Sequence, residues 1–553
     1  MTDPASMSSF ATTIMNMKYA HDIPDTGKET WPEIAKRVAW TVMKAVSTPK
    51  SVIREIEKMI AERKFMPGGR YLYATGRPYH QVQNCLLMRA EDSREGWSEL
   101  MAKGTMALMT GAGIGVVYSD VRAKGKAIRK TGGTATGPLA LMQMLNEAGR
   151  GIMQGGSRRS AIWAGLHWDH PDCIEFIQMK NWSPEVRALK EKDYNFPAMM
   201  DGTNVSVILD DNFFKAYHDD KHKNHALAHT VYWTTVRQML KTAEPGFSID
   251  VGVNRGENLR NACTEVCSKD DSDICNLGSI NMARIESLEE MKRVVELSTM
   301  FLLAGTAYSD VPYAKVDQIR TKNRRLGLGL MGLHEWLLMK GKKYEADAEL
   351  EEYLKIYATS GEVAAKHAAE WDLSVPVKTR AIAPTGTIGI VAETTTGIEP
   401  IFCVAYKRRY LKGSVVHYQY VVDPTAQRLI ESGVNPEAIE DAYVLAENVE
   451  RRVAFQAWMQ KYVDHAISST INLPSWGSEL NNTDRVNDFG NMLMKHLPNL
   501  RGVTCYPDGA RGGQPLTPIK YSTAAKHMGQ EFSEVVLEAA DVCEISKGGS
   551  CGA

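Results

Sequence analysis

The residues best suited to chemistry in this 553-residue chain are three cysteines and two polar neighbours. Cys263 lies between Asn261 and Glu265, Cys275 follows twelve positions after Cys263, and Cys85 lies far upstream. In an extended segment alternate side chains project to the same side, so an amide, a thiol and a carboxyl base would share one small volume. Such a set could serve nucleophilic or acid–base chemistry. Taken alone, however, three buried structural cysteines explain the pattern better, because free Cys is among the most buried residue types.

Two glycine-rich segments could approach a phosphate. In APTGTIG, at 383–389, glycine lets the backbone come close, and threonine hydroxyls with the N–H groups of a turn entering a helix could bind an anion. A plain strand-to-helix turn is the alternative explanation. The segment GAGIG, at 111–115, lacks the final glycine of a dinucleotide fingerprint, so we reject a Rossmann interpretation.

Composition excludes several classes of protein. The net charge is −1, which argues against nucleic acid or an anionic membrane as the main partner. No apolar run approaches the roughly 20 residues that span a bilayer, and the N-terminus lacks the order of a signal peptide, so we expect a cytoplasmic protein. An odd count of 9 scattered cysteines does not indicate a disulfide scaffold.

Histidines recur at helical spacing in one charged segment, namely at His218, His222, His225 and His229. Asp-Asp-Lys interrupts that segment, so a solvated surface is the better interpretation. His167 and His170 precede Cys173, but no Cys/His quartet has the spacing of a zinc site, and we expect no metal ligand set.

The elements that must position these residues alternate along the chain. Helical periodicity runs from Trp31 to Phe65 and ends at Pro67-Gly68-Gly69. Beyond it, short apolar runs alternate with helical patterns, which predicts an α/β architecture with parallel strands. The runs are SAIWAGL (160–166), NVSVIL (204–209), TRAIAP (379–384) and TIGIVA (387–392), and the helical patterns cover 137–153, 229–241, 350–371 and 444–467.

Seven motifs together resemble the large chains of ribonucleotide reductases. They occur in the order found in that family, and they cover roughly residues 65 to 515. The motifs are NCLLM, GAGIGVVYSDVRAKG, GGSRRSAIWAGLHWDHPDCIEFI, NACTEV with CNLGSIN, RLGLGLMGLHEWL, APTGTIGIVAETTTGIEPIF and SSTINLP.

The resemblance implies a role for each residue of the first set. Cys263 would be the thiyl radical that abstracts the 3′-hydrogen of the ribose, Glu265 would take the 3′-hydroxyl proton, and Asn261 would hold the sugar hydroxyls. Cys85 and Cys275 would supply two reducing equivalents and end as a disulfide. The expected activity is therefore reduction of ribonucleotides to deoxyribonucleotides, with thioredoxin or a similar dithiol as the external reductant.

The family also implies binding sites away from these cysteines. It implies a homodimer too, because the family's effector site lies at a dimer interface. Its phosphate cradle matches Pro384, Thr385, Gly386, Thr387 and Ile388. Its effector site, which binds a deoxynucleoside triphosphate or ATP, matches Asp92, Arg122 and Arg129. The loop that relays effector identity to substrate choice matches Gln154 and Arg158.

The resemblance is greatest to the adenosylcobalamin-dependent class II form. Class I chains carry two adjacent tyrosines near the end of the barrel, whereas this chain has Cys505-Tyr506 and no Tyr-Tyr pair. A class I subunit with a radical-bearing partner, and an inactive nucleotide-binding regulatory protein, remain as alternatives. Cys543 and Cys551 could be a tail pair that rereduces the active-site disulfide.

The expected fold follows from the same resemblance. We expect a ten-stranded α/β barrel of the reductase and glycyl-radical type, with Cys263 on a central loop. The predicted division is a helical N-terminal segment without a full ATP cone (1–69), a catalytic barrel (70–518) and a C-terminal segment with a mobile tail (519–553).

Overall fold

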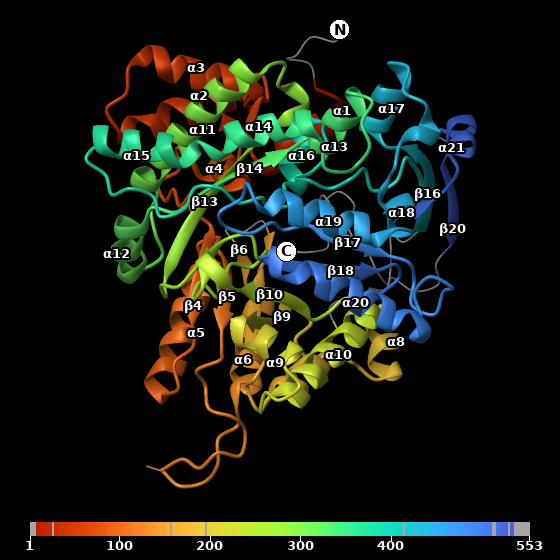
Figure 1. Ribbon diagram of the computed structural model, residues 1–553. Coiled ribbons are helices and arrows are strands. Elements are labelled where there is room, and N and C mark those ends of the chain that lie inside the picture. Colours follow the sequence, from red (N-terminus) through yellow and green to blue (C-terminus); the bar gives the residue numbers. More distant parts are fainter. Residues whose placement is uncertain are drawn as a thin grey trace.

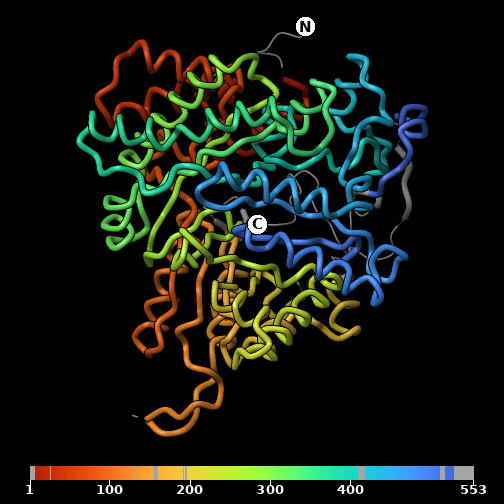
Figure 2. Tube along the Cα trace, viewed as in Figure 1, coloured from red at the N-terminus to blue at the C-terminus, as the bar shows by residue number. Residues whose placement is uncertain are grey.

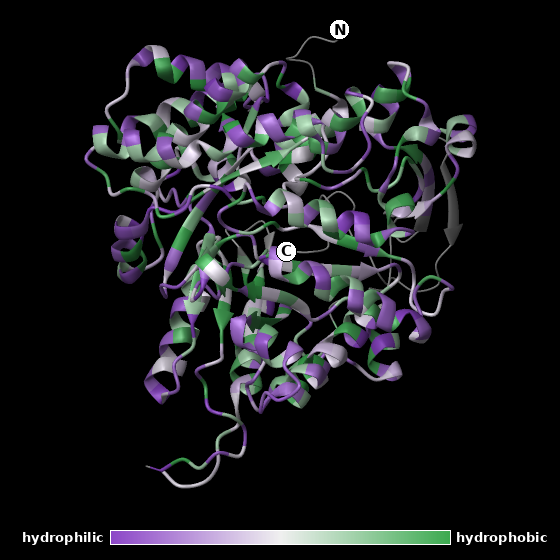
Figure 3. Cartoon of the chain, in the orientation of Figure 1, coloured by the Kyte–Doolittle hydropathy of each residue, from purple (hydrophilic) through white to green (hydrophobic). Residues whose placement is uncertain are grey.

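The computed structural model describes residues 7–24, 27–129, 131–154, 158–193, 196–412, 415–510, 516–528 and 531–535. A large sheet runs through the middle of the molecule, with helices on its outside and the N-terminal helices stacked over one end (Figure 1). Apolar residues concentrate in the strands and in the helix faces turned towards them, while the outward faces are polar (Figure 3). No helix within the described residues is long and apolar enough to cross a membrane.

The N-terminal segment is helical, as the periodicity predicted, and its helices form a layer together with the long helix α11. Helix α2 begins at a capping box in which the Glu33 carboxylate accepts from the Thr30 backbone N–H at 2.7 Å. Its apolar stripe, including Ile34 and Val38, is buried together with residues of the long helix α11. The helices of this layer are α1 (Ser9–Lys18), α2 (Trp31–Val42), α3 (Lys50–Ala61), α4 (Gly69–Ala74) and α11 (Leu288–Tyr308).

The first half of the large sheet is parallel. Neighbouring strands in it follow one another along the chain, and each connection carries helical segments that cover the outer face. The strands are β4 (Cys85–Arg89), β5 (Gly113–Val117), β8 (Ile162–His167), β9 (Thr203–Asp210) and β10 (Gly246–Asp250). The helices are α5 (Arg94–Met109), α6 (Pro138–Arg150), α7 (Cys173–Gln178), α8 (Pro184–Lys192), α9 (Asp211–His218) and α10 (His225–Thr242).

The second half of the sheet runs in the opposite direction. Strand β13 (Asp273–Asn281) is antiparallel to β4 and parallel to β14 (Leu326–Met331), and β3 (Phe65–Pro67) pairs with it off the main path. At the other edge β18 (Gly502–Pro507) is antiparallel to β10 and parallel to β17 (Thr470–Leu473). The remaining outer helices are α12 (Ala314–Asn323), α13 (Leu333–Met339), α14 (Ala348–Ala358), α15 (Ser360–Glu370), α16 (Gly386–Ala392), α19 (Val449–Gln460) and α20 (Val486–His496).

The two outermost strands of the sheet are bridged by a segment of residues 378–382. The Leu328 N–H donates to the Thr379 carbonyl at 2.9 Å, and the Ala381 N–H donates back to the Leu328 carbonyl at 3.0 Å. On its other side the Ser468 N–H donates to the Ile382 carbonyl at 2.9 Å, two residues before β17 begins at Thr470. Edge groups of β14 and of the chain leading into β17 therefore have backbone partners on this segment.

A smaller antiparallel sheet lies at the side of the molecule, beyond α17 (Pro424–Glu431) and α18 (Ala442–Ala446) (Figure 1). Its strand order is β19-β15-β16-β20, and helix α21 (Tyr521–His527) packs on it. The strands are β15 (Ala405–Lys412), β16 (Val415–Val422), β19 (Leu516–Pro518) and β20 (Glu531–Val535).

The alternation predicted from the sequence is confirmed for two of the four apolar runs, while the run at 379–384 forms only isolated bridges to neighbouring segments and no strand of its own. The runs at 160–166 and 204–209 are the buried strands β8 and β9, and the four helical patterns are helical. The run at 387–392, however, lies in helix α16. Its residues pack into the core around β14 and α11, and short apolar runs of this length do not distinguish a strand from a buried helix.

Candidate active site

A hairpin loop carries Asn261, Cys263 and Glu265 onto the inner face of the sheet. Strands β11 (Leu259–Arg260) and β12 (Cys267–Ser268) pair at its base, and β11 contacts β4, β5 and β8. The apolar cluster around the loop includes Leu259 and Val266 together with residues of the inner sheet face. The loop therefore lies inside the molecule, against the first half of the sheet.

Glycines in β5 allow this close approach. A Cβ on Gly115 would lie 1.9 Å from the Arg260 carbonyl oxygen, and one on Gly113 would lie 3.1 Å from the Ala262 Cβ. Any side chain at Gly115 would thus push the loop away from the sheet. The GAGIG segment, which the sequence excluded as a dinucleotide fingerprint and matched to a family motif, thus positions the loop that carries Cys263.

The loop is a turn, and the prediction of an extended segment is wrong. Thr264 has φ +68°, and its N–H donates to the Asn261 carbonyl at 3.1 Å. The Asn261 side-chain oxygen accepts from the Val266 N–H at 3.0 Å, so the amide holds the turn closed. The three side chains come together through this turn and not through strand alternation.

Cys85 and Cys275 are directly opposite each other in the antiparallel pair of β4 and β13. Both thiols are buried, with 2% and 0% exposure, and neither is in a disulfide. Opposite residues in such a pair have Cα atoms about 4.5–5.5 Å apart, within the range that a disulfide spans. The Cys85 Sγ also lies 3.8 Å from Glu265 Oε1, so the loop carboxyl contacts the thiol pair.

The electrostatics of the site favour neutral groups. Burial raises the pKa of the Glu265 carboxyl from 4.5 to about 7, and its Oε2 has no hydrogen-bond partner among the described residues. Burial, followed by the nearby Glu265 carboxylate, raises the pKa of Cys85 well above its usual value, and burial does the same for Cys275. Cys263 alone of the three thiols is partly exposed. The arrangement thus offers one accessible thiol, one buried base and a buried dithiol.

The predicted phosphate cradle lies at the start of α16, which follows the segment 378–382 directly along the chain. Thr385 caps the helix with φ +53°, and its hydroxyl accepts from the Gly397 N–H at 2.8 Å. The first N–H groups of a helix lack partners inside it, so those of Gly386 and the next residues are available to an anion. The same helix ends at Glu393, which has φ +55°.

The N-terminal layer holds the end of this helix, a contact that sequence reasoning missed. Arg63 Nη1 lies 2.9 Å from Glu393 Oε2, and the Ser8 N–H donates to Glu393 Oε1 at 3.0 Å. Arg63 is buried with 2% exposure. Partners separated by more than 300 positions leave no local pattern from which this contact could have been found.

Two of the predicted effector residues are in contact on the outside of the sheet. Arg122 Nε donates to Asp92 Oδ2 at 2.8 Å, and Arg122 and Arg129 are exposed. The segment between β5 and α6, drawn in orange, extends away from the body of the molecule (Figures 1 and 2). The predicted relay residues Gln154 and Arg158 are paired across the short strands β6 (Met153–Gln154) and β7 (Arg158–Arg159). The predicted tail pair, Cys543 and Cys551, lies outside the described residues.

The histidines of the charged segment do not share one helix face. His218 ends α9, His222 lies in the following turn, and the rings of His225 and His229 in α10 are 4.3 Å apart. His225 and His229 each contact a backbone carbonyl of α9. Among the described residues no group of three or more His, Cys, Asp or Glu side chains could hold a metal ion.

Comparison with known proteins identifies the family. A sequence model of the ribonucleotide reductase barrel domain matches residues 83–230, 221–370 and 377–497, and a model of the family's all-alpha domain matches residues 5–80. The chain belongs to the ribonucleotide reductase family. The barrel match contains Cys85, the loop and the phosphate segment, while the all-alpha match contains Ser8 and Arg63, which contact Glu393.

Relatives of the family share modest identity over most of the chain. A vitamin B12-dependent ribonucleoside-diphosphate reductase of Mycobacterium tuberculosis is 25% identical over 96% of this chain and 84% of its own length. A protein of the same name from Thermoplasma acidophilum is 26% identical over 84% of this chain and 66% of its own. A protein of Mycobacterium phage D29, named for adenosylcobalamin-dependent ribonucleoside-triphosphate reduction, is 24% identical over 93% and 95%.

Proposed function

We propose that this chain reduces ribonucleotides to 2′-deoxyribonucleotides by thiyl radical chemistry, as an adenosylcobalamin-dependent class II reductase. One observation supports this most directly. The Cys85–Cys275 pair is opposed across two strands and contacts Glu265, on the same loop that presents Cys263. A reduction that removes a hydroxyl as water needs two electrons, and an opposed dithiol supplies them by forming one disulfide.

Each side chain has a task that its environment suits. Cys263 abstracts the 3′-hydrogen of the ribose and later returns it, which requires a thiol that substrate can reach. Glu265 takes the 3′-hydroxyl proton, and a pKa of about 7 lets it accept and release that proton near neutral pH. One thiol of the pair protonates the 2′-hydroxyl, which leaves as water. The second thiol hydrogen goes to C2′, and the two sulfurs join as the Cys85–Cys275 disulfide. Asn261 keeps the turn closed and contacts the sugar hydroxyls.

Binding is divided between two faces of the chain. Thr385, Gly386 and Thr387, with the flanking Pro384 and Ile388, hold the substrate phosphates at the start of α16. Arg122 and Arg129 bind the triphosphate of a nucleotide effector, while the Asp92 carboxylate, released from Arg122, accepts from its sugar or base. Gln154 and Arg158 carry the effect towards the substrate.

The residues around Cys263 fit a radical source that binds outside the loop. Cys263 is partly exposed while the other residues of the set are buried, so a bound organic cofactor can reach this thiol first. When bound, adenosylcobalamin supplies a carbon-centred radical by homolysis of its cobalt–carbon bond. Cys505 is fully buried, and Tyr506 beside it has no adjacent tyrosine, so this strand lacks the pair that a radical relay from another subunit uses.

The finer features of the fold and the partners are part of the same proposal. Backbone contacts of residues 378–382 with both outer strands support a closed ten-stranded barrel. We divide the chain into a helical segment (1–69), the barrel (70–518) and a C-terminal segment (519–553) whose Cys543 and Cys551 rereduce the active site. A thioredoxin-like dithiol in the cytoplasm then reduces the tail, and a homodimer completes the effector site.

The test is an anaerobic assay of the purified chain with mixed ribonucleotides, a dithiol and adenosylcobalamin. We expect deoxyribonucleotides only when the cofactor is present. Product that appears only with a metal-loaded partner subunit would move the chain to class I. No product under either condition, with nucleotide binding retained, would favour an inactive regulatory protein.

A further inference from the structure

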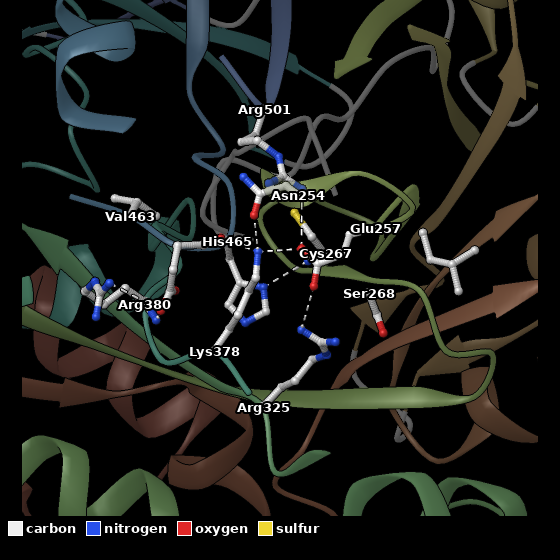
Figure 4. Close-up of polar contacts among 12 residues, drawn as sticks. Asn254, Glu257, Cys267, Ser268, Arg325, Lys378, Arg380, Val463, His465 and Arg501 are labelled. Atoms are coloured by element: carbon white, nitrogen blue, oxygen red, sulfur yellow. Dashed lines mark hydrogen bonds and ion pairs between the residues drawn. The ribbon is translucent and has the colours of Figure 1, made fainter. Parts of the chain in front are cut away.

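A cluster of buried charged groups lies at the base of the catalytic loop, and neither the reaction nor the binding sites above use it (Figure 4). We call it the basal cluster, and its cationic members come from different parts of the sheet. Arg325 directly precedes β14, Lys378 begins the bridging segment, and Arg501 directly precedes β18. The cluster consists of Asp250, Glu257, Arg260, Asp273, Arg325, Lys378, His465 and Arg501.

Glu257 is the shared anion at the centre of this cluster. Its carboxylate is paired with Lys378 Nζ, lies 3.5 Å from Arg325 Nη1 and lies 3.7 Å from Arg501 Nη2. The Arg325 and Arg501 side chains are only 2% and 5% exposed. One carboxylate therefore serves two buried arginines and the partly buried Lys378, and the two arginine contacts are longer than charge-assisted hydrogen bonds.

Among the described residues of the cluster, buried donors without a hydrogen bond outnumber buried acceptors without one. Those acceptors are Asp250 Oδ1 and Glu257 Oε2, and the second is ion-paired with Lys378. Within the described residues, Nε, Nη1 and Nη2 of Arg501, Nη1 of Arg325 and Nε of Arg260 have no hydrogen-bond acceptor. His465 adds another donor, because its Nδ1 accepts from the Cys267 N–H at 3.1 Å and its Nε2 must then carry the proton. That Nε2 also has no acceptor in the described part of the chain. Buried unsatisfied donors of this number are costly unless an unseen acceptor is present.

The formal charges of the cluster also sum to an excess of positive charge, which agrees with the excess of donors. Arg260, Arg325, Lys378 and Arg501 face the three carboxylates of Asp250, Glu257 and Asp273, which leaves one positive charge. The nearby Asp464 is matched by Arg380, at 3.3 Å. Burial and these cations lower the pKa of His465 well below its usual value, so the ring is neutral and adds a donor without adding charge.

We propose that the basal cluster binds one small monovalent inorganic anion, of the chloride class, through N–H groups of Arg501, Arg325 and His465. A single negative charge balances the excess, and a spherical acceptor can meet donors that arrive from several directions. A water molecule would satisfy some donors but would leave the charge uncompensated. A nucleotide phosphate is too large and too highly charged for a site whose arginines are almost fully buried.

The anion would stabilise the catalytic loop from below. His465 holds the Cys267 N–H, and the next residue, Ala466, donates its N–H to the Glu265 carbonyl at 2.8 Å. The segment 465–466 is therefore bonded to the loop on either side of Val266. Fixing His465 on an anion fixes this segment, and the proposal concerns a structural site that stands whether or not the proposed reaction is correct.

The test uses the full chain at constant ionic strength, with gluconate replaced stepwise by chloride or bromide. We expect the thermal midpoint to rise and then saturate with either halide. We also expect Arg501→Gln to weaken the apparent halide affinity at least tenfold. The matched control is Arg485→Gln, which removes the same charge at a position outside the basal cluster. The Arg485 side chain is 52% exposed. An equal halide response in Arg501→Gln and in the unaltered chain would refute the site.

A second measurement uses the unaltered chain, so its result does not depend on whether Arg501→Gln folds. Crystals grown in bromide should show an anomalous peak in contact with Arg501 and His465. Ordered water at that position, without anomalous signal, would overturn the proposal. Neither measurement depends on turnover, so failure of the proposed reductase activity and failure of the anion site are distinguishable.

Discussion

The Glu265 carboxyl gives the sharpest quantitative prediction, because its burial should cost stability at neutral pH. Its pKa is 4.5 in an exposed chain and about 7 in the folded protein, since burial disfavours the carboxylate. The folded state therefore binds the proton more tightly, and stability falls as pH rises from about 4.5 to 7. From these two values the cost is about 1 kcal/mol at pH 5 and about 3 kcal/mol at pH 8.

Glu265→Gln removes this titration. Any change in packing or hydrogen bonding from the amide is the same at both pH values, so the difference between them isolates the carboxyl. Relative to the unaltered chain, we expect Glu265→Gln to be more stable at pH 8 than at pH 5 by about 2 kcal/mol, measured by urea unfolding. Glu362→Gln is the matched control, because Glu362 is exposed on α15 and should show no such difference.

The same group should set the acidic limb of the activity profile. If Glu265 must be ionised to take the 3′-hydroxyl proton, kcat/KM of the free enzyme should rise with pH through about 7. Glu265→Gln should lose turnover. An acidic limb near 4.5, together with a stability difference that does not change with pH, would refute the argument that burial tunes this carboxyl.

The remaining predictions concern the thiols, the effector pair and the end of the phosphate helix. Cys85→Ser or Cys275→Ser should abolish product even in a single turnover. Peptide mass mapping of the unaltered chain after one turnover without reductant should find these two residues joined. A different disulfide would contradict the assigned pair. Arg122→Gln should remove effector-driven choice among substrates, because the guanidinium fork is lost. The measurement is the ratio of products with and without each deoxynucleoside triphosphate. An unchanged ratio would exclude this site. Glu393→Gln should raise KM by about tenfold with less effect on kcat, because the end of α16 loses its ion pair with Arg63 of the N-terminal layer. A tenfold fall in kcat at unchanged KM would argue against a role of this ion pair in positioning α16.

The sequence predicts the elements better than it predicts how they meet. Helical periodicity identified the N-terminal layer and the long helices, because one apolar face per helix suffices to bury them. Strands β8 and β9 were visible as apolar runs bounded by polar residues. The run at 387–392 was misassigned because a helix buried on most sides has no period to read. The site residues came from the resemblance, since Cys, Asn and Glu alone also fit a structural explanation.

The contacts that adjust the site are invisible in the sequence for a physical reason. The ion pair of Arg63 with Glu393 joins residues that only tertiary packing brings together. The basal cluster consists of single charged residues that lie near the starts of several strands. In the sequence each of them, taken alone, would be predicted to be a surface charge. In the sequence Gly115 looks like part of a nucleotide fingerprint. In the structure it leaves room for the loop, because a Cβ at this position would lie 1.9 Å from the Arg260 carbonyl oxygen. Long-range sheet pairing creates all three features, and no local window contains them.

The opposed thiol pair shows how the fold and the chemistry depend on the same pattern. In β4, Cys85 and Leu87 face the inner cluster around the loop, while Leu86 faces the outer core beneath the helices. In β13, Cys275 faces inward and Ile274 faces outward. A slip of one residue in either strand would move a thiol into the outer core and an aliphatic side chain into the site. Selection for a buried outer face therefore also maintains the register that opposes the two sulfurs, so the redox pair needs no separate device to hold it in place.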